Sequence, residues 1–289
     1  MDRTNRSRQE LLTFLVSTFG LSSFFYYRII SAGGLQQAGA GAILGLMWCP
    51  GAAALVTRLI FQRSLRDLGW GLGKPRYLLA SYLLPLACAL VAYGLVWIAG
   101  PGASFDAPFT EQIAERLSSR WGWTLGSDLA ILSVFFLLVA TRGVFFSVVF
   151  ALGEEIGWRG LLVPRLAETT SYTNTSWISG LVWALWHWPL ILLADYRGPS
   201  VAWSLIAFTL LTVAFSFIYA WLRLKSGSLW TAVILHGSHN AFVQEFFDRV
   251  TAPTEYTEYL VGEFGILIVA VVSVAAWLCW RRRGEVQQP

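Results

Sequence analysis

The stretch DLAILSVFFLLVATRGVFFSVVFALG, residues 128–153, decides the fold class of this chain. After Asp128 it holds a single charged residue, Arg142, and it exceeds the ~20 apolar residues that an α-helix needs to cross a ~30 Å hydrocarbon core. Lipid offers no hydrogen-bond partners to an open backbone, so a run of this length predicts a membrane-spanning helix.

Further apolar runs flank this stretch and predict an all-α polytopic membrane protein. Hydrophobic residues make up 56% of the 289-residue chain and charged residues only 13%, which excludes a disordered chain and a soluble globular protein. Gly, Pro and charge clusters divide the chain into about eight predicted transmembrane helices. Their ranges are about 11–30, 38–61, 77–100, 128–153, 176–193, 201–222, 229–247 and 260–280.

Basic residues gather in the segments between alternate runs and predict the orientation. Lys and Arg are frequent before residue 11, in 62–76 and after residue 280, and sparse in the segments on the other side. By the positive-inside rule, this asymmetry predicts a multi-pass protein of the cell membrane with both termini cytoplasmic. The formal charge of +4 then reflects topology, and no nucleic-acid partner is expected. The acids of the outer segments include Glu245 and Glu263.

The chain shows no internal division. Without a repeat or a low-complexity segment, we expect one membrane domain over residues 1–289. No small-x-small cleavage site follows the first run promptly, so we expect that run to be a span rather than a signal peptide. The three cysteines, Cys49, Cys88 and Cys279, lie inside apolar runs without paired spacing, which indicates neither a disulfide framework nor a cysteine zinc site.

Polar residues occur at membrane depth in three places, and these are the candidate sites of chemistry. They are GEEIGWRG (153–160) at the end of the fourth run, WALWHWP (183–189) in the fifth and HGSHN (236–240) in the seventh. An ionisable group inside a bilayer costs several kcal/mol and therefore indicates a function. All 3 histidines of the chain fall in the second and third places.

Helical spacing sorts these residues. Arg159 follows Glu155 by four positions, so the two share a face and can form an ion pair, which has a purely structural interpretation. The Glu154 side chain points about 100° away from that of Glu155 around the helix axis, so it does not share the face of the ion pair. It is a spare carboxylate, either a functional group or a solvated acid at a helix end. His236 and Asn240 share a face in the same way, with His239 on a neighbouring face.

These segments resemble the motifs of the CPBP family, which includes the CAAX prenyl proteases and the bacteriocin-processing and Abi-type membrane proteins. The chain carries Glu-Glu-x-x-x-Arg, then an aromatic residue four positions before His187, then His-x-x-x-Asn, in order and in separate runs, within a motif core of about 150–245. Trp183 stands where the family usually has Phe and keeps an aromatic wall. Arg142 lies outside the motif set, and we interpret it as a member of a buried ion pair rather than as a substrate contact.

The resemblance implies an intramembrane endopeptidase that acts on a membrane-associated protein or peptide within the lipid bilayer. It implies that Glu154 is the general base, that His187 orients the water, and that His236 and Asn240 donate hydrogen bonds to the oxyanion. Glu155 and Arg159 would form the ion pair at the site. We expect the catalytic cavity to open toward the cytoplasmic half, since the acidic pair ends a helix that runs from outside to inside.

Other interpretations stay open at this stage. A zinc protease of the same fold would use Glu154, His187 and His236 as ligands. Those residues come from three separate runs without a close His pair, and we therefore expect no metal cofactor. A non-enzymatic immunity or scaffold protein would keep the same residues as a structural network. A small-molecule transporter would usually show repeated halves and broken helices, and neither is visible in the sequence.

Overall fold

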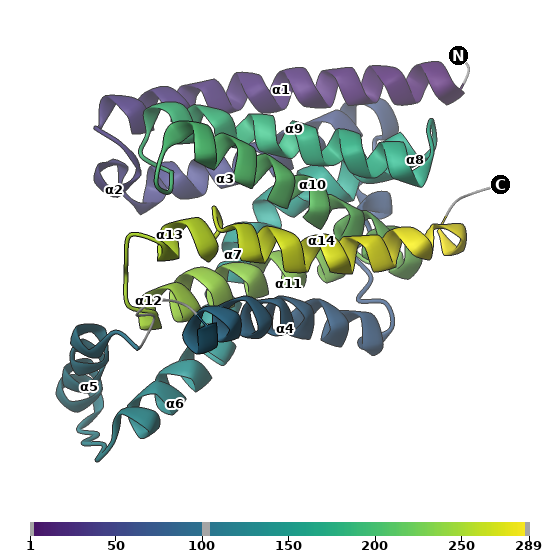
Figure 1. Cartoon of the computed structure of the whole chain (residues 1–289). Helices are drawn as coiled ribbons and strands as arrows, with labels where there is room; N and C mark the ends of the chain where they lie inside the picture. Colours follow the sequence, from purple (N-terminus) through teal and green to yellow (C-terminus); the bar gives the residue numbers. More distant parts are fainter. Residues whose placement is uncertain (1–2, 100–104, 287–289) are drawn as a thin grey trace.

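The computed structural model describes residues 3–99 and 105–286, and within these ranges the chain is helical between short connections, with no strand (Figure 1). A lone antiparallel bridge joins Phe105 to Thr251. Each predicted apolar run coincides with a helix. The long helices are α1 (Arg3–Ser31), α3 (Ala40–Gln62), α4 (Pro75–Ala99), α9 (Tyr172–Leu193), α10 (Val201–Ser226) and α14 (Ile266–Arg281), with two composite helices described below.

The shorter helices lie in the connections between the long ones. They are α2 (Leu35–Ala38), the single-turn helix η1 (Arg66–Leu68), α5 (Ala107–Trp121), α13 (Thr257–Leu260) and η5 (Arg283–Glu285). Asp106 caps α5, because its carboxylate accepts a hydrogen bond from the Phe109 amide over 2.9 Å. Because α14 begins at Ile266, the predicted run 260–280 starts too early, and Glu263 lies in the connection before the helix.

The run that decides the fold class is part of a longer helix. It consists of α6 (Asp128–Leu138), the π-helical segment η2 (Val139–Gly143), α7 (Val144–Glu155), the π-helical segment η3 (Ile156–Leu162) and α8 (Val163–Ala167). The prediction that this helix ends at residue 153 with the acidic pair is therefore wrong. The backbone stays helical through the charged motif, and both acids have buried partners there, Arg159 for Glu155 and Trp183 for Glu154.

The helix that carries the His-x-x-x-Asn motif is also composite. It runs through α11 (Trp230–His239), the π-helical segment η4 (Asn240–Phe247) and α12 (Asp248–Val250). The π-helical segment begins at Asn240, directly after the two histidines. Extra-residue turns of this kind are frequent at functional sites, because they change the direction in which the following side chains point.

Within residues 3–99 and 105–286, five helices are long and apolar enough to cross a membrane. They are Ala40–Gln62, Pro75–Ala99, Asp128–Ala167, Tyr172–Leu193 and Val201–Ser226. The chain is thus an all-α polytopic membrane protein. The number of eight spans stays a prediction, since the remaining long helices do not meet that standard of length and apolarity.

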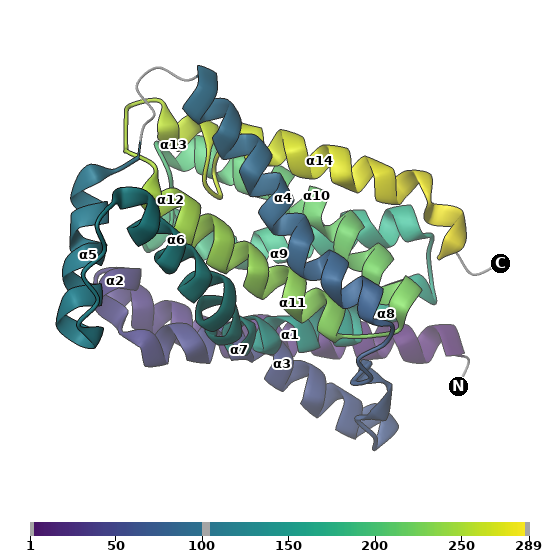
Figure 2. The ribbon, with the colours of Figure 1, turned by 90° about the horizontal axis from the view of Figure 1, so that it is seen from below.

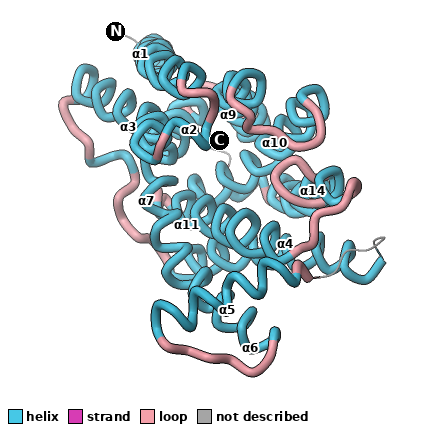
Figure 3. The backbone as a smooth tube through the Cα atoms, turned by 90° about the vertical axis from the view of Figure 1, so that its left-hand side faces the viewer, coloured by secondary structure: helices cyan, strands magenta, loops and turns pink. Residues whose placement is uncertain are grey.

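Glycines let the motif helices approach one another closely. A Cβ on Gly157 would lie 2.5 Å from Pro50 Cβ, and one on Gly153 would lie 2.7 Å from the Met47 carbonyl oxygen, so α3 packs directly on α7 and η3. A Cβ on Gly237 would lie 2.8 Å from the Val148 nitrogen, which brings α11 equally close to α7. Small residues spaced by four are a common way to pack membrane helices. Figures 2 and 3 show these helices side by side around α7.

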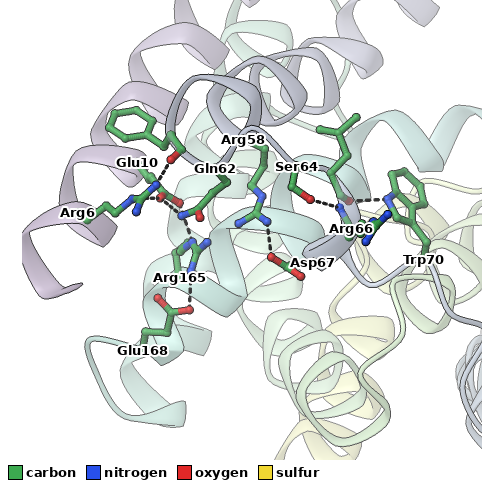
Figure 4. A network of polar contacts seen from close by, with 12 residues as sticks. Arg6, Glu10, Arg58, Gln62, Ser64, Arg66, Asp67, Trp70, Arg165 and Glu168 are labelled. Atoms are coloured by element: carbon green, nitrogen blue, oxygen red, sulfur yellow. Dashed lines mark hydrogen bonds and ion pairs between the residues drawn. The ribbon is translucent and has the colours of Figure 1, made fainter.

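Both ends of the chain lie at the same end of the helix bundle (Figures 1 and 2). A polar network joins α1, α3 and α8 there (Figure 4). At its centre Glu10 is 1% exposed, 2.8 Å from Arg165 Nε and 3.6 Å from Arg6 Nε, and it also accepts a hydrogen bond from Gln62. Arg165 in turn pairs with Glu168 over 2.6 Å. The network fixes the N-terminal half of α1 to the end of the motif helix.

Candidate active site

A cavity of about 350 Å³ lies among α3, α7, α9, α10 and the α11–η4 helix. Glu154, His187, His236 and Asn240, the four residues expected to be catalytic, all line it. The three sequence motifs are thus brought together by the fold although up to 86 positions separate them along the chain. The remaining lining is mostly aliphatic and aromatic, which makes the polar residues the minority groups that ligand sites typically use for orientation.

Glu155 and Arg159 form a buried ion pair, and neither residue belongs to the cavity lining. Arg159 Nη1 lies 2.9 and 3.2 Å from the two carboxylate oxygens of Glu155, and both side chains are 0% exposed. The guanidinium is sandwiched between aromatic rings, 4.4 Å from the Trp183 centroid and 3.8 Å from that of Tyr219. Buried on all sides, Arg159 is absent from the cavity lining and serves the acid beside it.

Glu154 is separate from this pair and faces the cavity. Its Oε2 accepts hydrogen bonds from two indole nitrogens, Trp183 Nε1 at 2.9 Å and Trp158 Nε1 at 3.3 Å. At 1% exposure it is no solvated acid at a helix end, so that interpretation is wrong. Trp183 contributes a donor that Phe, the usual residue of the family motif, lacks.

The His187 ring is oriented by its own helix. Its Nδ1 lies 3.0 Å from the Trp183 carbonyl oxygen, which can only accept, so Nδ1 carries the proton and donates. The ring packs against Trp186 and Phe208, with centroids 4.7 and 4.8 Å away. Nε2 is the nitrogen left for a water or a substrate in the cavity.

His236 and Asn240 present one free polar group each. His236 Nδ1 lies 2.9 Å from Glu155 Oε1, so the ion pair also fixes this ring and leaves Nε2 for the cavity. The Asn240 carbonyl oxygen accepts a long 3.4 Å hydrogen bond from Gln244 Nε2, which leaves the amide NH₂ group to donate.

The cavity also has a second cluster of polar residues, which the sequence did not predict. His239, expected on a neighbouring face, lines the cavity together with Glu263, Tyr196, Gln244 and Glu245. Tyr196 OH donates to Glu263 Oε2, and His239 Nε2 lies 3.9 Å from Glu263 Oε1. Burial raises the pKa of the Glu263 carboxyl above its ordinary value, against the hydrogen bond from Tyr196 that lowers it. No sequence signal marks Glu263, because it follows a glycine in a connection and reaches the cavity only through the tertiary fold.

Arg142 does not have the role expected of it. The side chain is exposed on η2, where its guanidinium lies 5.3 Å from the centroid of the Phe146 ring, and it has no ion pair within the described parts of the chain. The interpretation of Arg142 as a member of a buried ion pair is therefore wrong. In the π-helical turn that carries it, Val139 is the residue that faces the protein interior.

The cavity extends toward the end of the bundle opposite the termini. Leu35, Tyr196 and Glu263 of its lining come from connections at the end that carries α2 and α13, whereas both termini lie at the other end (Figure 1). The reason given for a cytoplasmic opening, an acidic pair at a helix end, is also wrong, since the helix continues to Ala167. With cytoplasmic termini, this end of the cavity faces the opposite side of the membrane.

The positions of the histidines also bear on whether this site could bind a metal ion. Both candidate histidine ligands have their Nδ1 atoms held by acceptors, as zinc-bound histidines usually do. Yet in the residues that the structure describes, no group of three or more His, Cys, Asp and Glu side chains is close enough to hold one ion. The donor set that is present therefore does not fit a zinc centre, and the absence of a metal requirement stays a prediction.

The part of the chain that carries the motifs matches a known protein family. Residues 136–242 match the family model described as type II CAAX prenyl endopeptidase Rce1-like. The resemblance to the CPBP family is confirmed. The Rce1-like segment contains Glu154, Glu155, Arg159, His187, His236 and Asn240, and it ends two residues after the last of them.

One curated relative extends the match beyond the Rce1-like segment. The chain is 27% identical over 172 residues to CAAX prenyl protease 2 of Methanococcus maripaludis, which covers 58% of this chain and 56% of that protein. The match thus spans about half the length of that relative.

Proposed function

We propose that this protein is an intramembrane endopeptidase that hydrolyses a peptide bond of a membrane-associated protein or peptide. The observation that carries the proposal is the position of Glu154. It is kept out of the Glu155–Arg159 pair and lines one cavity with His187, His236 and Asn240. A buried carboxylate without a cationic partner is poised to exchange a proton with a water molecule.

In the proposed reaction, Glu154 acts as the general base. A water between Glu154 and His187 Nε2 gives a proton to the carboxylate while its oxygen attacks the carbonyl carbon of the scissile bond. The tetrahedral intermediate then collapses, the C–N bond breaks, and Glu154 returns the proton to the leaving nitrogen. The aromatic lining keeps bulk water away, which strengthens each electrostatic contact inside the cavity.

His236 and Asn240 stabilise the developing oxyanion. Asn240 offers its NH₂ group, and His236 Nε2 donates when the ring is doubly protonated, since Nδ1 already donates to Glu155. The neighbouring charges favour the doubly protonated ring. Glu154, Glu155 and Arg159 together carry one excess negative charge in a buried cluster, and a positive charge on His236 balances it. A single donor of this kind contributes about 3 to 4 kcal/mol of transition-state stabilisation in other hydrolases.

The proposal is tested with the purified protein in vesicles and a library of membrane-anchored peptides. Wild type should cleave a subset of them, and Glu154→Gln should lose at least ~10³-fold in kcat, as expected for removal of an essential base. Glu115→Gln, an exposed Glu on α5, is the matched control and should keep full activity. A folded wild type that cleaves no peptide, or a Glu154→Gln variant that cleaves as well as wild type, favours the non-enzymatic scaffold instead.

The zinc alternative is tested in the same preparation. We expect far less than one equivalent of zinc by elemental analysis and full activity after prolonged treatment with a strong chelator. Zinc in stoichiometric amount, lost together with activity and restored with it on adding the metal back, would assign Glu154, His187 and His236 as ligands.

A further inference from the structure

The active-site cavity has an acidic lining, in which carboxylates outnumber the cationic side chains of the described residues. Three carboxylates line it, those of Glu154, Glu245 and Glu263, and no Lys or Arg occurs among the described residues of the lining. Arg159, the nearest guanidinium to the motif, is 0% exposed behind Trp183 and Tyr219. Away from the oxyanion donors His236 and Asn240, the three carboxylates outnumber the one imidazolium, so this lining attracts a positively charged group.

One polar atom in the lining has no partner. His239 is 6% exposed, and its Nε2 makes no hydrogen bond to any residue that the structure describes. Glu263 Oε1 lies 3.9 Å from this nitrogen. That separation is too long for a direct hydrogen bond and short enough for one donor group to contact both atoms. A buried nitrogen left open in this way costs free energy unless a ligand completes it.

Two aromatic residues of the lining, Tyr196 and Phe208, lie on the Glu263 side of the cavity, and Phe264, which is not among the lining residues, packs against both rings. The Tyr196 ring lies 5.8 Å from Phe208 and 5.4 Å from Phe264, and Phe208 and Phe264 lie 5.9 Å apart. Tyr196 OH donates to Glu263 Oε2, which leaves Oε1 facing His239. Aromatic faces beside a carboxylate favour an alkylammonium ion, because the ring quadrupole and the carboxylate both attract the positive charge.

We propose that Glu263, His239 and the Tyr196 and Phe208 rings form a subsite for a primary ammonium group, the side chain of a lysine in the substrate peptide. This inference rests on the proposed peptidase function and names the substrate feature that the cavity selects. An ammonium group has three N–H donors and no acceptor, which suits the Glu263 carboxylate and, in the tautomer protonated at Nδ1, His239 Nε2. The ammonium also offsets the cost that burial imposes on the ionised Glu263 carboxyl, the cause of its raised pKa.

The lysine lies close to the scissile bond. The ring centroids of Tyr196 and His187 are 6.0 Å apart, so the ring that holds Glu263 also borders the residue that orients the water. An ethanolamine lipid headgroup carries the same ammonium, but its phosphate would enter a cavity that holds three carboxylates. The acidic lining therefore favours a peptide side chain over a lipid headgroup.

The test moves one lysine along a membrane-anchored peptide and compares each peptide with its norleucine analogue, which has an uncharged chain of similar length. The enzyme is assayed in phosphatidylcholine vesicles. At one lysine position next to the scissile bond, the kcat/KM of wild type should be roughly tenfold higher for the lysine peptide than for its norleucine analogue. A difference of that size is expected for a hydrogen bond to a charged group. Glu263→Gln should erase the difference, and Glu255→Gln, an exposed acid in the same outer segment, should keep it. Adding phosphatidylethanolamine should not weaken the preference.

The outcomes separate the subsite from the proposed function. Cleavage without a lysine preference at any position, or a preference that survives Glu263→Gln, overturns the subsite and leaves the peptidase function standing. Tighter binding of the lysine peptide to Glu154→Gln, together with a wild type that cleaves nothing, supports the subsite and overturns the function. Loss of the preference on adding phosphatidylethanolamine assigns the subsite to a lipid. If Glu263→Gln does not fold, His239→Gln takes its place. It should lower the ratio of kcat/KM for the lysine peptide to that for the norleucine peptide at least roughly threefold, and an unchanged ratio overturns the subsite.

Discussion

Trp183 Nε1 donates a hydrogen bond to Glu154 Oε2 over 2.9 Å, so a residue that replaces the usual Phe of the motif holds the spare carboxylate of the cavity. The same indole ring covers Arg159 at 4.4 Å. Trp183 thus contacts both the proposed base and the cation of the neighbouring ion pair. It keeps the two carboxylates in different environments, although they are adjacent in the chain.

Trp183→Phe should lower kcat/KM roughly tenfold, because it removes the shorter of the two hydrogen bonds to Glu154 while it keeps an aromatic ring over Arg159. The folded yield should stay near that of wild type. Trp177→Phe is the control, since Trp177 lies on the same helix, is 48% exposed and does not line the cavity. Equal activities of the two variants would show that the indole hydrogen bond has no part in the reaction.

Glu155→Gln should destabilise the protein, whereas Glu154→Gln should leave its stability near that of wild type. Loss of the Glu155 charge leaves Arg159 buried without its counter-ion, and breaking a buried pair in this way costs about 3 to 5 kcal/mol. It also removes the charged acceptor of His236. Thermal unfolding in detergent, followed by tryptophan fluorescence, measures the difference. Two variants of equal stability would contradict the division of roles between the adjacent acids.

Gly157→Ala should reduce the folded yield strongly, because its Cβ would lie 2.5 Å from Pro50 Cβ and 2.8 Å from the Pro50 backbone. Backbone cannot move aside as a flexible side chain can, so α3 and η3 would have to separate. Gly94→Ala on α4 is the matched control, because a Cβ there has no atom within 4 Å. In a helix that substitution should be neutral or stabilising by up to about 1 kcal/mol. If both variants fold equally well, the close packing of α3 on η3 is not needed.

The sequence was a good guide to what is local. Run length and composition located the long helices, and four-residue spacing placed Arg159 beside Glu155 and Asn240 on the cavity wall with His236. It failed where contacts between distant segments decide the outcome. The helix continues past Gly153, and Glu154 is satisfied inside the bundle by Trp158 of the continuing helix and by Trp183 of α9. Charge alone marked that point as a helix end.

Glu263 shows the same limit in the connections. As an acid in an outer segment it resembled any solvated loop residue, and only the approach of Tyr196 from another connection shows that it belongs to the cavity. Arg142 shows the converse, since a cation within an apolar run is exposed beside Phe146 instead of paired. A π-helical turn carries it, and a change in local helix geometry of this kind has no signature in the hydrophobic pattern.

The last prediction concerns the sides of the membrane. Single cysteines at Gly284, at Ser118 and at Glu258, in a variant without the native cysteines, should fall into two groups when sealed vesicles are treated with a membrane-impermeant maleimide. Gly284 lies at the end of the bundle with the termini, whereas α5 and α13, which carry Ser118 and Glu258, lie at the other end (Figure 1). Because Lys and Arg are concentrated at the termini end, Gly284 should react from the cytoplasmic side and the other two from the opposite side. Reaction of all three from one side would contradict a bundle that spans the membrane. Reversed labelling would keep the bundle, contradict cytoplasmic termini, and place the cavity end with Glu263 in the cytoplasm.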